Sequence, residues 1–490
     1  MVDKCGGLPL AIVVLSGLLS HKKGLGEWQK VKDRLWKNIE DDSIEISYIL
    51  SLSYNDLSTA LKQCFLYFAI FPEDQVLEAE NIIQLWMAEG FIPNGEERME
   101  DVAEGFLNGL IRRSLVQVAR TFWEKVTVCR VHDLLRDLVI QKALEVNFFD
   151  IYDPRKRSIS SLCIRHVIHS QGERYLSLDL SNLKLRSIMF FDHDFRNMSL
   201  INFSSVFQHI YVLYLDILGG TVPYAIGSLY HLKFLSLRGI GNLPSSIGNL
   251  KNLQTLCVKS EFRRLCQLPP ETAGIINLRH LVAWYSEPLV RISKLTGLQA
   301  FKDICCDQWK DVDPVDLVNL LELSMIDITK SYSLNNIRSL KNLSTLKLIC
   351  RETETLPSLE FVNCCGKLQK LWLDGRIEKL PLFPNSITMM VLFYSKLTED
   401  PMSILEMLPN LRKLEFLRAY EGEEIMCSDN NFCQLEFLSL GSLANLERWH
   451  LATYAMPLIK GLLIQDCRKL KEIPKRMKDV KLFKHMKGFI

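Results

Sequence analysis

The sequence predicts a multidomain protein whose larger part is a curved α/β solenoid. Three observations lead to this fold class: a repeated apolar pattern, the absence of that repeat before about residue 150, and a helical apolar spacing in that first segment. The pattern Leu-x-x-Leu-x-Leu returns about every two dozen residues from Ile159 to the C-terminus. The three apolar side chains of one unit form a short strand that buries its apolar face only by stacking on its neighbours. We therefore expect a leucine-rich-repeat horseshoe with an exposed concave sheet.

Fourteen units are expected, because fourteen apolar residues each begin a copy of the pattern. These anchors are Ile159, Leu185, Ile210, Leu232, Leu253, Leu278, Leu298, Leu320, Leu343, Leu368, Ile387, Leu411, Leu435 and Ile459. Leu-x-x-Leu also occurs on amphipathic helices, but chance spacing seldom persists over so many units. Leu-Pro pairs such as Leu243-Pro244 follow several of the expected strands, where proline ends regular pairing and begins the convex connection. The first two units and the last are the least regular, as expected of capping units.

The segment before the repeats has the apolar spacing of short helices. Helices are predicted over residues 8–19, 27–36, 46–57, 61–71, 79–88 and 96–110. Residues 115–118 and 125–128 alternate like the two strands of a hairpin, and a last helix follows over 134–143, with Asp133 placed to cap its first turn. Helices followed by a β-hairpin are typical of a winged helix. We therefore divide the chain into a helical segment (1–43), a winged helix (44–150) and the repeats (151–490).

The composition describes a globular protein, with 48% hydrophobic and 24% charged residues in a chain of 490. The formal net charge is only +2, but the charge is unevenly placed. Residues 73–104 carry ten acidic side chains against one arginine, and residues 468–487 carry nine lysines or arginines against two acids. For both stretches a solvated face is the favoured interpretation, and a docking contact within or between chains is the alternative.

Several function classes are disfavoured by the residues present. A DNA-binding winged helix needs basic residues on its recognition helix, whereas residues 78–89 hold Glu78, Glu80 and Glu89 and no lysine or arginine, so no nucleic-acid partner is expected. No nucleophile elbow, metal-ligand cluster or framed pair of acids occurs, so the chain is not expected to be an enzyme.

Cysteine usage and hydropathy bear on the compartment. The fourteen cysteines show no Cys-x-x-Cys pair and are scattered along the chain, which favours reduced core residues and a cytoplasmic protein. No apolar run reaches the length of a membrane helix, so no integral membrane segment is expected. The alternative is secretion, because residues 8–19 have the length of a signal-peptide core and Asn197, Asn202 and Asn342 begin glycosylation sequons.

Four motifs occur in an order and spacing that resemble one known family. They are Cys5–Ala11 (CGGLPLA), Cys64–Asp74 (CFLYFAIFPED), Leu85–Phe91 (LWMAEGF) and Val131-His132-Asp133. Together with the repeat array they resemble the plant intracellular immune receptors of the nucleotide-binding leucine-rich-repeat type, in their coiled-coil class. The resemblance implies that residues 1–43 end a nucleotide-binding module and that the repeats recognise a pathogen effector or a guarded host protein. It also implies that the winged helix helps to regulate an ADP/ATP switch in plant defence.

The resemblance assigns two residues to the nucleotide pocket. In the family, the proline of the first motif and the histidine of the last line an ADP site, which correspond to Pro9 and His132 here. From the residues alone, the favoured interpretation is that Pro9 only starts a helix and His132 only fills a domain seam. No G-x-x-x-x-G-K-[ST] loop and no strand ending in paired aspartates occurs, so nucleotide binding is expected to be very weak and ATP hydrolysis absent. We therefore expect an N-terminally truncated receptor whose parent supplies the nucleotide-binding and coiled-coil domains.

Partner contacts are expected on the concave strand positions, where exposed aromatic side chains alternate with charged ones. The candidates are Tyr214, Phe234, Arg238, His280, Trp284, Trp372, Asp374, Lys413, Glu415 and Phe437. For each aromatic residue, sideways packing on a neighbouring strand is an equally good interpretation. A second hypothesis for the whole chain is a repeat scaffold or adaptor without nucleotide switching, which leucine-rich repeats alone would permit.

Overall fold

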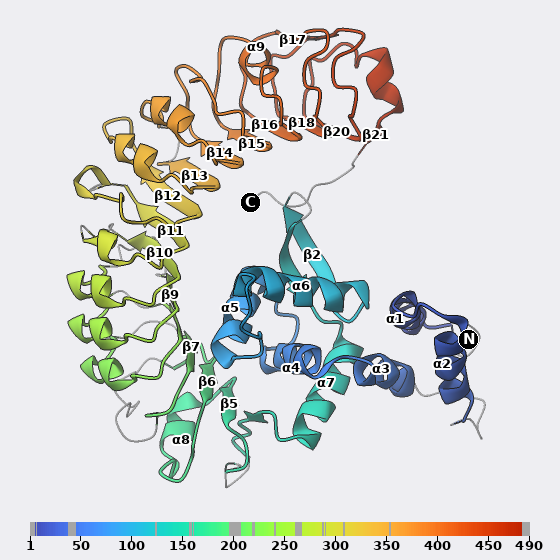
Figure 1. Cartoon of the computed structure of the whole chain (residues 1–490), viewed down its shortest axis with the longest axis vertical. Helices are drawn as coiled ribbons and strands as arrows, with labels where there is room; N and C mark the ends of the chain where they lie inside the picture. The colour runs from blue at the N-terminus through green and yellow to red at the C-terminus, as the bar shows by residue number, and fades with distance from the viewer. Residues whose placement is uncertain are drawn as a thin grey trace.

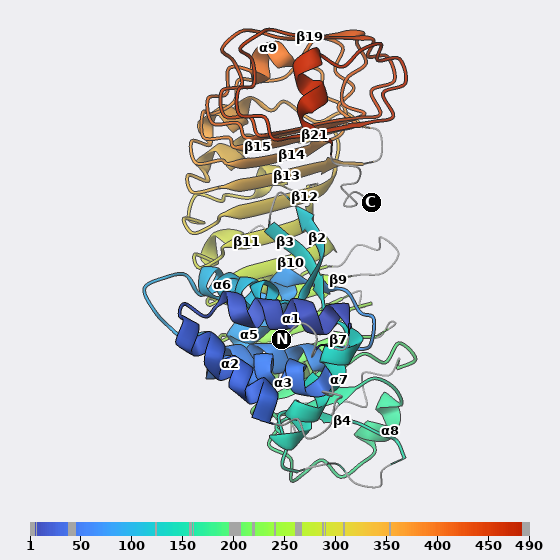
Figure 2. The same ribbon diagram turned by 90° about the vertical axis from the view of Figure 1, so that its right-hand side faces the viewer.

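The computed structural model shows a horseshoe of stacked strands with a helical region inside its curve (Figure 1). It describes residues 5, 7–37, 46–122, 125–155, 159, 161–195, 207–217, 221–239, 242–259, 267–286, 289, 291–306, 309–351 and 354–482. The first two helices lie farthest from the strands, and the helices between them and the sheet sit against its lower half (Figures 1 and 2).

The first three helices share a small core, although the third lies in residues 44–150, the range assigned to the winged helix. They are α1 (Pro9–Ser20), α2 (Leu25–Lys37) and α3 (Ile46–Asn55), which confirms the helices predicted there. Pro9 occupies the first turn of α1, where its missing N–H costs no hydrogen bond. Leu15 and Leu18 of α1 are buried with Leu35 of α2 and Ile49 of α3.

The next elements form the predicted winged helix. They are α4 (Thr59–Leu66), the 3-10 turn η2 (Tyr67–Ile70), β1 (Leu77–Glu78), α5 (Ala79–Glu89), α6 (Met99–Arg112), β2 (Gln117–Phe122), β3 (Lys125–Arg130) and α7 (Asp133–Glu145). Strand β3 pairs antiparallel with both β1 and β2, so the wing is a three-stranded sheet. Gly90 ends α5 with a φ of 76°, a left-handed conformation that favours glycine.

The cap of α7 differs from the prediction. Asp133 is the first helical residue and is exposed, and His132 is the cap. The extended backbone of His132 brings its ring over the first turn, where Nδ1 accepts a hydrogen bond from the Leu134 N–H at 3.3 Å. Because Nδ1 is the acceptor, the neutral ring carries its proton on Nε2.

The repeats form a parallel sheet of sixteen strands in the described part of the chain, with the strands in sequence order except for a separate pair. The strands are β4 (Asp150–Ile151), β5 (Arg165–Ile168), β6 (Ser187–Phe190), β7 (Val212–Asp216), β8 (Phe234–Arg238), β9 (Thr255–Lys259), β10 (His280–Ser286), β11 (Ala300–Cys305), β12 (Glu322–Ile328), β13 (Thr345–Cys350), β14 (Lys370–Asp374), β15 (Met389–Phe393), β16 (Lys413–Leu417), β18 (Phe437–Gly441), β20 (Gly461–Gln465) and β21 (Lys481–Leu482). The separate pair is β17 (Glu424–Cys427) with β19 (Arg448–Leu451).

Short helices and turns make the other side of the repeats. They are α8 (Gly172–Leu176), η4 (Tyr224–Ser228), η5 (Ser245–Asn249), η6 (Pro270–Gly274), η7 (Ile292–Lys294), η8 (Trp309–Asp311), η9 (Asn335–Ser339), η10 (Glu360–Cys364), α9 (Met402–Leu405) and η11 (Lys475–Asp479). Asparagines that precede the anchors tie neighbouring units together. Asn252, Asn277 and Asn342, for example, each donate a side-chain hydrogen bond to a backbone carbonyl of the preceding unit. These bonds satisfy carbonyls that the turns would otherwise leave without partners.

The predicted anchors from Leu185 to Leu435 are buried in the core, whereas Ile159 and Ile459 of the two end units are partly buried against it. Leu162 and Ile164 were expected to point inward, but 74% and 40% of their surfaces are exposed. The inward positions belong instead to Cys163, His166 and Ile168, four residues later than the pattern that begins at Ile159. His166 fills an apolar position because its Nδ1 pairs with the Tyr175 hydroxyl at 2.9 Å. With β4 and β21 at the two ends, the sheet also has more strands than the fourteen expected units.

Candidate functional site

The concave face of the first repeats is covered by the winged helix of the same chain. One hydrophobic core runs from α4, α5 and α7 into Met189, Tyr214 and Phe234 of the sheet. The ring of Phe71 packs edge-on against Phe191, 5.6 Å between centroids, and against Tyr214 at 6.4 Å. Apolar contact of this kind removes both surfaces from water, so the winged helix and the first repeats are one packed unit.

A buried carboxylate joins the end of α5 to strands β5 and β6. The side chain of Glu89 has no exposed surface. It accepts hydrogen bonds from Nε and Nη2 of Arg165, both at 3.0 Å, and from the hydroxyls of Tyr67 and Ser187. The Arg186 guanidinium lies 3.3 Å away. A buried charge is tolerated only when it is paired and hydrogen-bonded, and here two arginines from the repeats supply the pairing.

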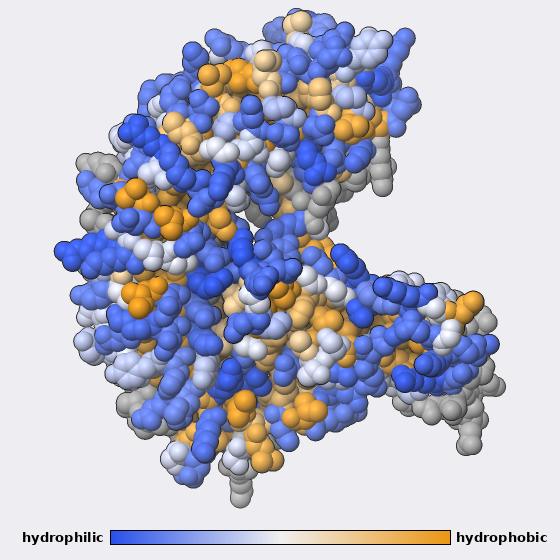
Figure 3. Space-filling model, viewed as in Figure 1, coloured by the Kyte–Doolittle hydropathy of each residue, from blue (hydrophilic) through white to orange (hydrophobic). Residues whose placement is uncertain are grey.

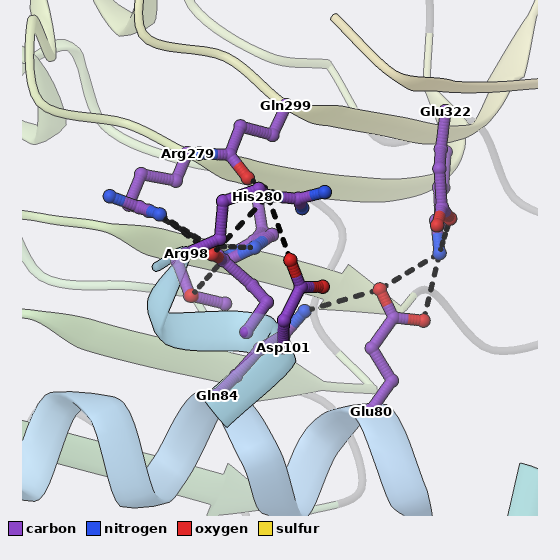
Figure 4. Close-up of polar contacts among 11 residues, drawn as sticks. Glu80, Gln84, Arg98, Asp101, Arg279, His280, Gln299 and Glu322 are labelled. Carbon is purple, nitrogen blue, oxygen red and sulfur yellow. Dashed lines mark hydrogen bonds and ion pairs between the residues drawn. The ribbon is translucent and has the colours of Figure 1, made fainter. Parts of the chain in front are cut away.

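A row of acids on the winged helix pairs with cations on the middle strands. Glu78 contacts Lys259 of β9 at 3.0 Å, and Glu80 contacts Lys302 of β11 at 2.8 Å. Lys302 also lies 2.6 Å from Glu322 of β12, so one ammonium bridges two carboxylates (Figure 4). Although burial lowers it, these two carboxylates raise the pKa of Lys302 well above its usual value.

The start of α6 contributes a second ionic contact. Glu100 accepts hydrogen bonds from Arg279 at 2.7 Å and lies 3.2 Å from Nε2 of His280, and Arg98 donates to Gln299 at 3.1 Å. Figure 4 shows these side chains meeting between the helix and the sheet. Burial raises the pKa of Glu100, but the hydrogen bonds from His280 and Arg279 outweigh it and lower the pKa to about 2. We call the Glu78, Glu80, Glu89 and Glu100 contacts together the clasp.

The wing reaches further along the sheet than the helices do. Its Phe122 ring lies 5.4 Å from the Trp372 ring of β14, and Lys347 of β13 sits over the same indole at 4.8 Å. Between the wing, helices α5 and α6 and strands β10 to β15 lies a cleft of about 600 Å³. Figure 3 shows the face of the molecule on which the winged helix fills the lower part of the arc, with a hollow above it.

The expected exposure of the concave residues is wrong for half of the candidates. All ten lie on strands of the sheet, but Tyr214, Phe234, His280, Lys413 and Glu415 are buried. Tyr214 and Phe234 lie in the core shared with the winged helix, and His280 contacts Glu100. For these three residues the reason is that the winged helix of the same chain occupies the sheet. Lys413 and Glu415 lie farther along, on β16, where Lys413 packs over the ring of Phe437 on the next strand.

The other five candidates keep some exposed surface. Arg238 pairs with Asp216 at 2.9 Å, and Trp372 packs on Phe122. Asp374 and Phe437 are half-buried, and Trp284 is 41% exposed. Burial raises the pKa of Asp374 to about 6, with Lys347 opposing the shift. Their role as partner contacts stays a prediction.

The two residues assigned to the nucleotide lie on different elements. Pro9 is exposed at the start of α1, whereas His132 is half-buried and lines a cavity of about 150 Å³ with Phe71, Arg130 and Arg136. The ring of His132 has Nε2 left to donate, which is compatible with a phosphate oxygen. Their nucleotide contacts stay a prediction.

The functional residues that the sequence did not single out are the clasp acids and their partners. Their signal was the acid-rich stretch 73–104. A solvated face, the interpretation favoured for it, is wrong for Glu78, Glu80 and Glu100, which make the alternative, a docking contact within the chain. The basic stretch behaves differently where it is described. Lys471 pairs with Glu447 at 2.7 Å inside the repeats, and residues 483–487 lie outside the described part.

Two kinds of feature are absent from the described residues, namely metal-ligand clusters and membrane-spanning helices. These residues contain no group of three or more side chains that could hold a metal ion. None of their helices is both long enough and apolar enough to cross a bilayer.

Comparisons with known proteins agree with this architecture. A family model described as "Leucine-rich repeat region" matches residues 184–486, and one described as "Disease resistance protein Winged helix domain" matches residues 70–139. Disease resistance protein RPH8A of Arabidopsis thaliana is 32% identical over 523 residues, covering 99% of this chain and 57% of the relative. Disease resistance protein RPP13 of the same plant is 34% identical over 478 residues, covering 93% and 54%.

Among solved structures, a leucine-rich-repeat protein of Leptospira interrogans aligns with a TM-score of 0.40 at 17% identity, covering 70% of this chain and 98% of that one. The chain spans about half the length of the curated relatives it matches. Its repeat region and its winged helix thus match separate family descriptions, and its relatives at this identity are resistance proteins. The chain belongs to the leucine-rich-repeat family and is a homologue of the plant disease resistance proteins, whose winged helix domain it also carries.

Proposed function

We propose that this chain is the sensing and restraining half of a plant innate immune receptor. In this proposal the repeats recognise a pathogen effector or a guarded host protein in the cytoplasm, and their concave face holds the winged helix at rest. The observation that supports it is the clasp, in which four acids of the winged helix meet cations of strands β5, β6, β9, β10 and β11 or the residues just before them.

The free energy of the clasp contacts is of the size that a two-state switch requires. Shifting a two-state equilibrium from 1:99 to 99:1 takes about 5.5 kcal/mol. Hydrogen bonds to charged groups contribute about 1.5–3 kcal/mol each, so two or three of them account for that amount. A partner that binds the repeats and separates only some of the clasp contacts would therefore release the winged helix.

An exchange of charges tests this role of the clasp in the receptor extended upstream through its reading frame. Glu100→Lys places a lysine against Arg279, so that two cations repel each other, and we expect effector-independent cell death when this variant is expressed in leaves. Adding Arg279→Glu restores an ion pair of opposite sense and should restore the resting state. Glu97→Lys, in the same loop region, is the matched control and should stay silent. A quiet Glu100→Lys receptor at normal protein level would refute the proposal.

The nucleotide part of the proposal concerns Pro9 and His132. We infer that they contact ADP or ATP only in the extended receptor and that the chain has no ATPase activity of its own. Calorimetry with ADP on the 490-residue chain and on the extended chain tests this. Binding by the extended chain alone, lost in His132→Ala, would support a truncated switch receptor. Binding by neither chain, with no phosphate loop encoded upstream, would favour a repeat scaffold or adaptor without nucleotide switching.

A further inference from the structure

The cleft between the wing and the sheet collects cations at one end. Its walls hold Lys347 and Lys370 on the adjacent strands β13 and β14, together with Arg120 and Lys125 of the wing. Lys347 and Lys370 alternate with the core residues Leu346, Leu348, Leu371 and Leu373, so both project from the concave face. Both walls therefore contribute cations at this end, although the lining as a whole also holds the acids Glu78, Glu80, Glu100, Asp101, Glu104, Asp303 and Glu322.

These cations are less completely paired than those of the clasp. Lys125 is 3.6 Å from Glu104. Within the described residues, no carboxylate comes within ion-pair distance of Lys347, Lys370 or Arg120, although Glu104 and Glu322 line the same cleft. Burial and the neighbouring Lys125 lower the pKa of Lys370, and together they outweigh Glu322 and Glu104, which raise it. A half-buried ammonium without a direct ion pair costs free energy, which an anionic ligand would recover.

The shape of the cleft restricts the class of anion. Its volume of about 600 Å³ lies in the range of small-molecule sites, roughly 300–1,000 Å³. The wing closes one side by packing Phe122 on Trp372, so a folded protein domain does not fit between the walls. Lysines act as point charges with three donors each and suit the many oxygens of a phosphate chain or phosphate cluster.

We propose that this cleft, which we call the wing cleft, binds a small polyphosphorylated molecule that bridges Lys125 of the wing and Lys347 and Lys370 of the repeats. Because both walls contribute, the ligand holds the wing against the sheet. It stabilises the closed arrangement by mass action, as does any ligand that binds one state only. This inference goes beyond the proposed function and does not depend on effector recognition or on ADP.

Calorimetry on the 490-residue chain with sodium tripolyphosphate as the probe tests the proposal. We expect saturable binding at low salt that is at least tenfold weaker in the Lys347→Gln/Lys370→Gln variant, since charge-assisted hydrogen bonds are lost. Lys367→Gln is the matched control, because Lys367 belongs to the same repeat but is exposed and donates to Asn342 at 2.7 Å. Equal affinity of the double variant and the wild type would overturn the proposal.

Two further measurements separate the alternatives. Lys125→Gln should also weaken binding, and the probe should slow amide exchange in β2 and β3. If neither change is observed, the ligand does not bridge the wing and the repeats. If hexaglutamate binds more tightly than tripolyphosphate, the ligand of the cleft is an acidic peptide and the polyphosphate proposal is wrong. Misfolding does not confound the test, because removing the unpaired charge of Lys370 should leave the melting temperature unchanged or raise it.

Discussion

The substitution Glu89→Gln tests whether the buried end of the clasp holds the winged helix to the first repeats. The amide keeps the shape of the side chain but removes the charge that faces Arg165 and Arg186, and its NH₂ group cannot accept their hydrogen bonds. Breaking a buried ion pair by changing one partner costs about 3–5 kcal/mol, because the other charge stays buried without compensation. The loss falls on the interface that joins α5 to β5 and β6.

Amide hydrogen exchange is the assay, because it reports the opening of individual elements. A loss of about 3–5 kcal/mol accelerates exchange by roughly 10²–10³-fold or more in the strands that the interface protects. The fast amides should therefore lie in β5, β6 and the end of α5, whereas β14 to β18 should exchange as in the wild type. Glu73→Gln, an exposed acid of the same domain, is the control and should change nothing.

A double-mutant cycle gives the sharper criterion. Arg165→Gln removes one of the charges that Glu89 compensates, so the two substitutions together should cost less than the sum of the single ones. Additive effects, or an acceleration of less than about threefold in β5 and β6 for Glu89→Gln, would refute the reasoning that this pair stabilises the interface.

Three other predictions concern substitutions of single residues. The lowered pKa of Glu100, about 2, means that its contribution to stability is present above its unfolded pKa near 4.5 and is lost as the pH falls from there toward about 2; Glu100→Gln should flatten the stability profile in that window. Burial raises the pKa of Glu415 to about 7, so its ionisation destabilises the fold as the pH rises from about 4.5 to about 7. Glu415→Gln should therefore raise the melting temperature at pH 8 but not at pH 4, and a loss at pH 8 would contradict this. A Cβ on Gly17 of α1 would lie 2.6 Å from the backbone of Arg113, so Gly17→Ala should cost about 1–3 kcal/mol in thermal unfolding, while Gly26→Ala, whose Cβ meets no atom within 4 Å, should be neutral or stabilising.

Local patterns predicted most of the fold because each repeat is a local structure. The inward positions of β8, for example, follow from Leu232, Leu235 and Leu237 alone, and the wing follows from two short alternating stretches. The first unit was placed four residues early because His166 occupies an apolar position, and its bond to Tyr175 makes that burial acceptable. The cap of α7 was placed one residue late because the side chain of His132, not that of Asp133, lies before the first helical residue.

The sequence by itself determined the repeat architecture, the winged helix and the motifs that resemble the resistance proteins, since each depends on residues close together in the chain. Only the tertiary structure decided what covers the concave face. Glu100 and Arg279 are separated by 179 positions, and no spacing rule connects them. The acid-rich stretch indicated a docking surface without naming its partner, because charge is attracted to any opposite charge. The acid-rich stretch contacts strand β10 because the curvature of the stacked repeats brings His280 and its neighbours around the winged helix.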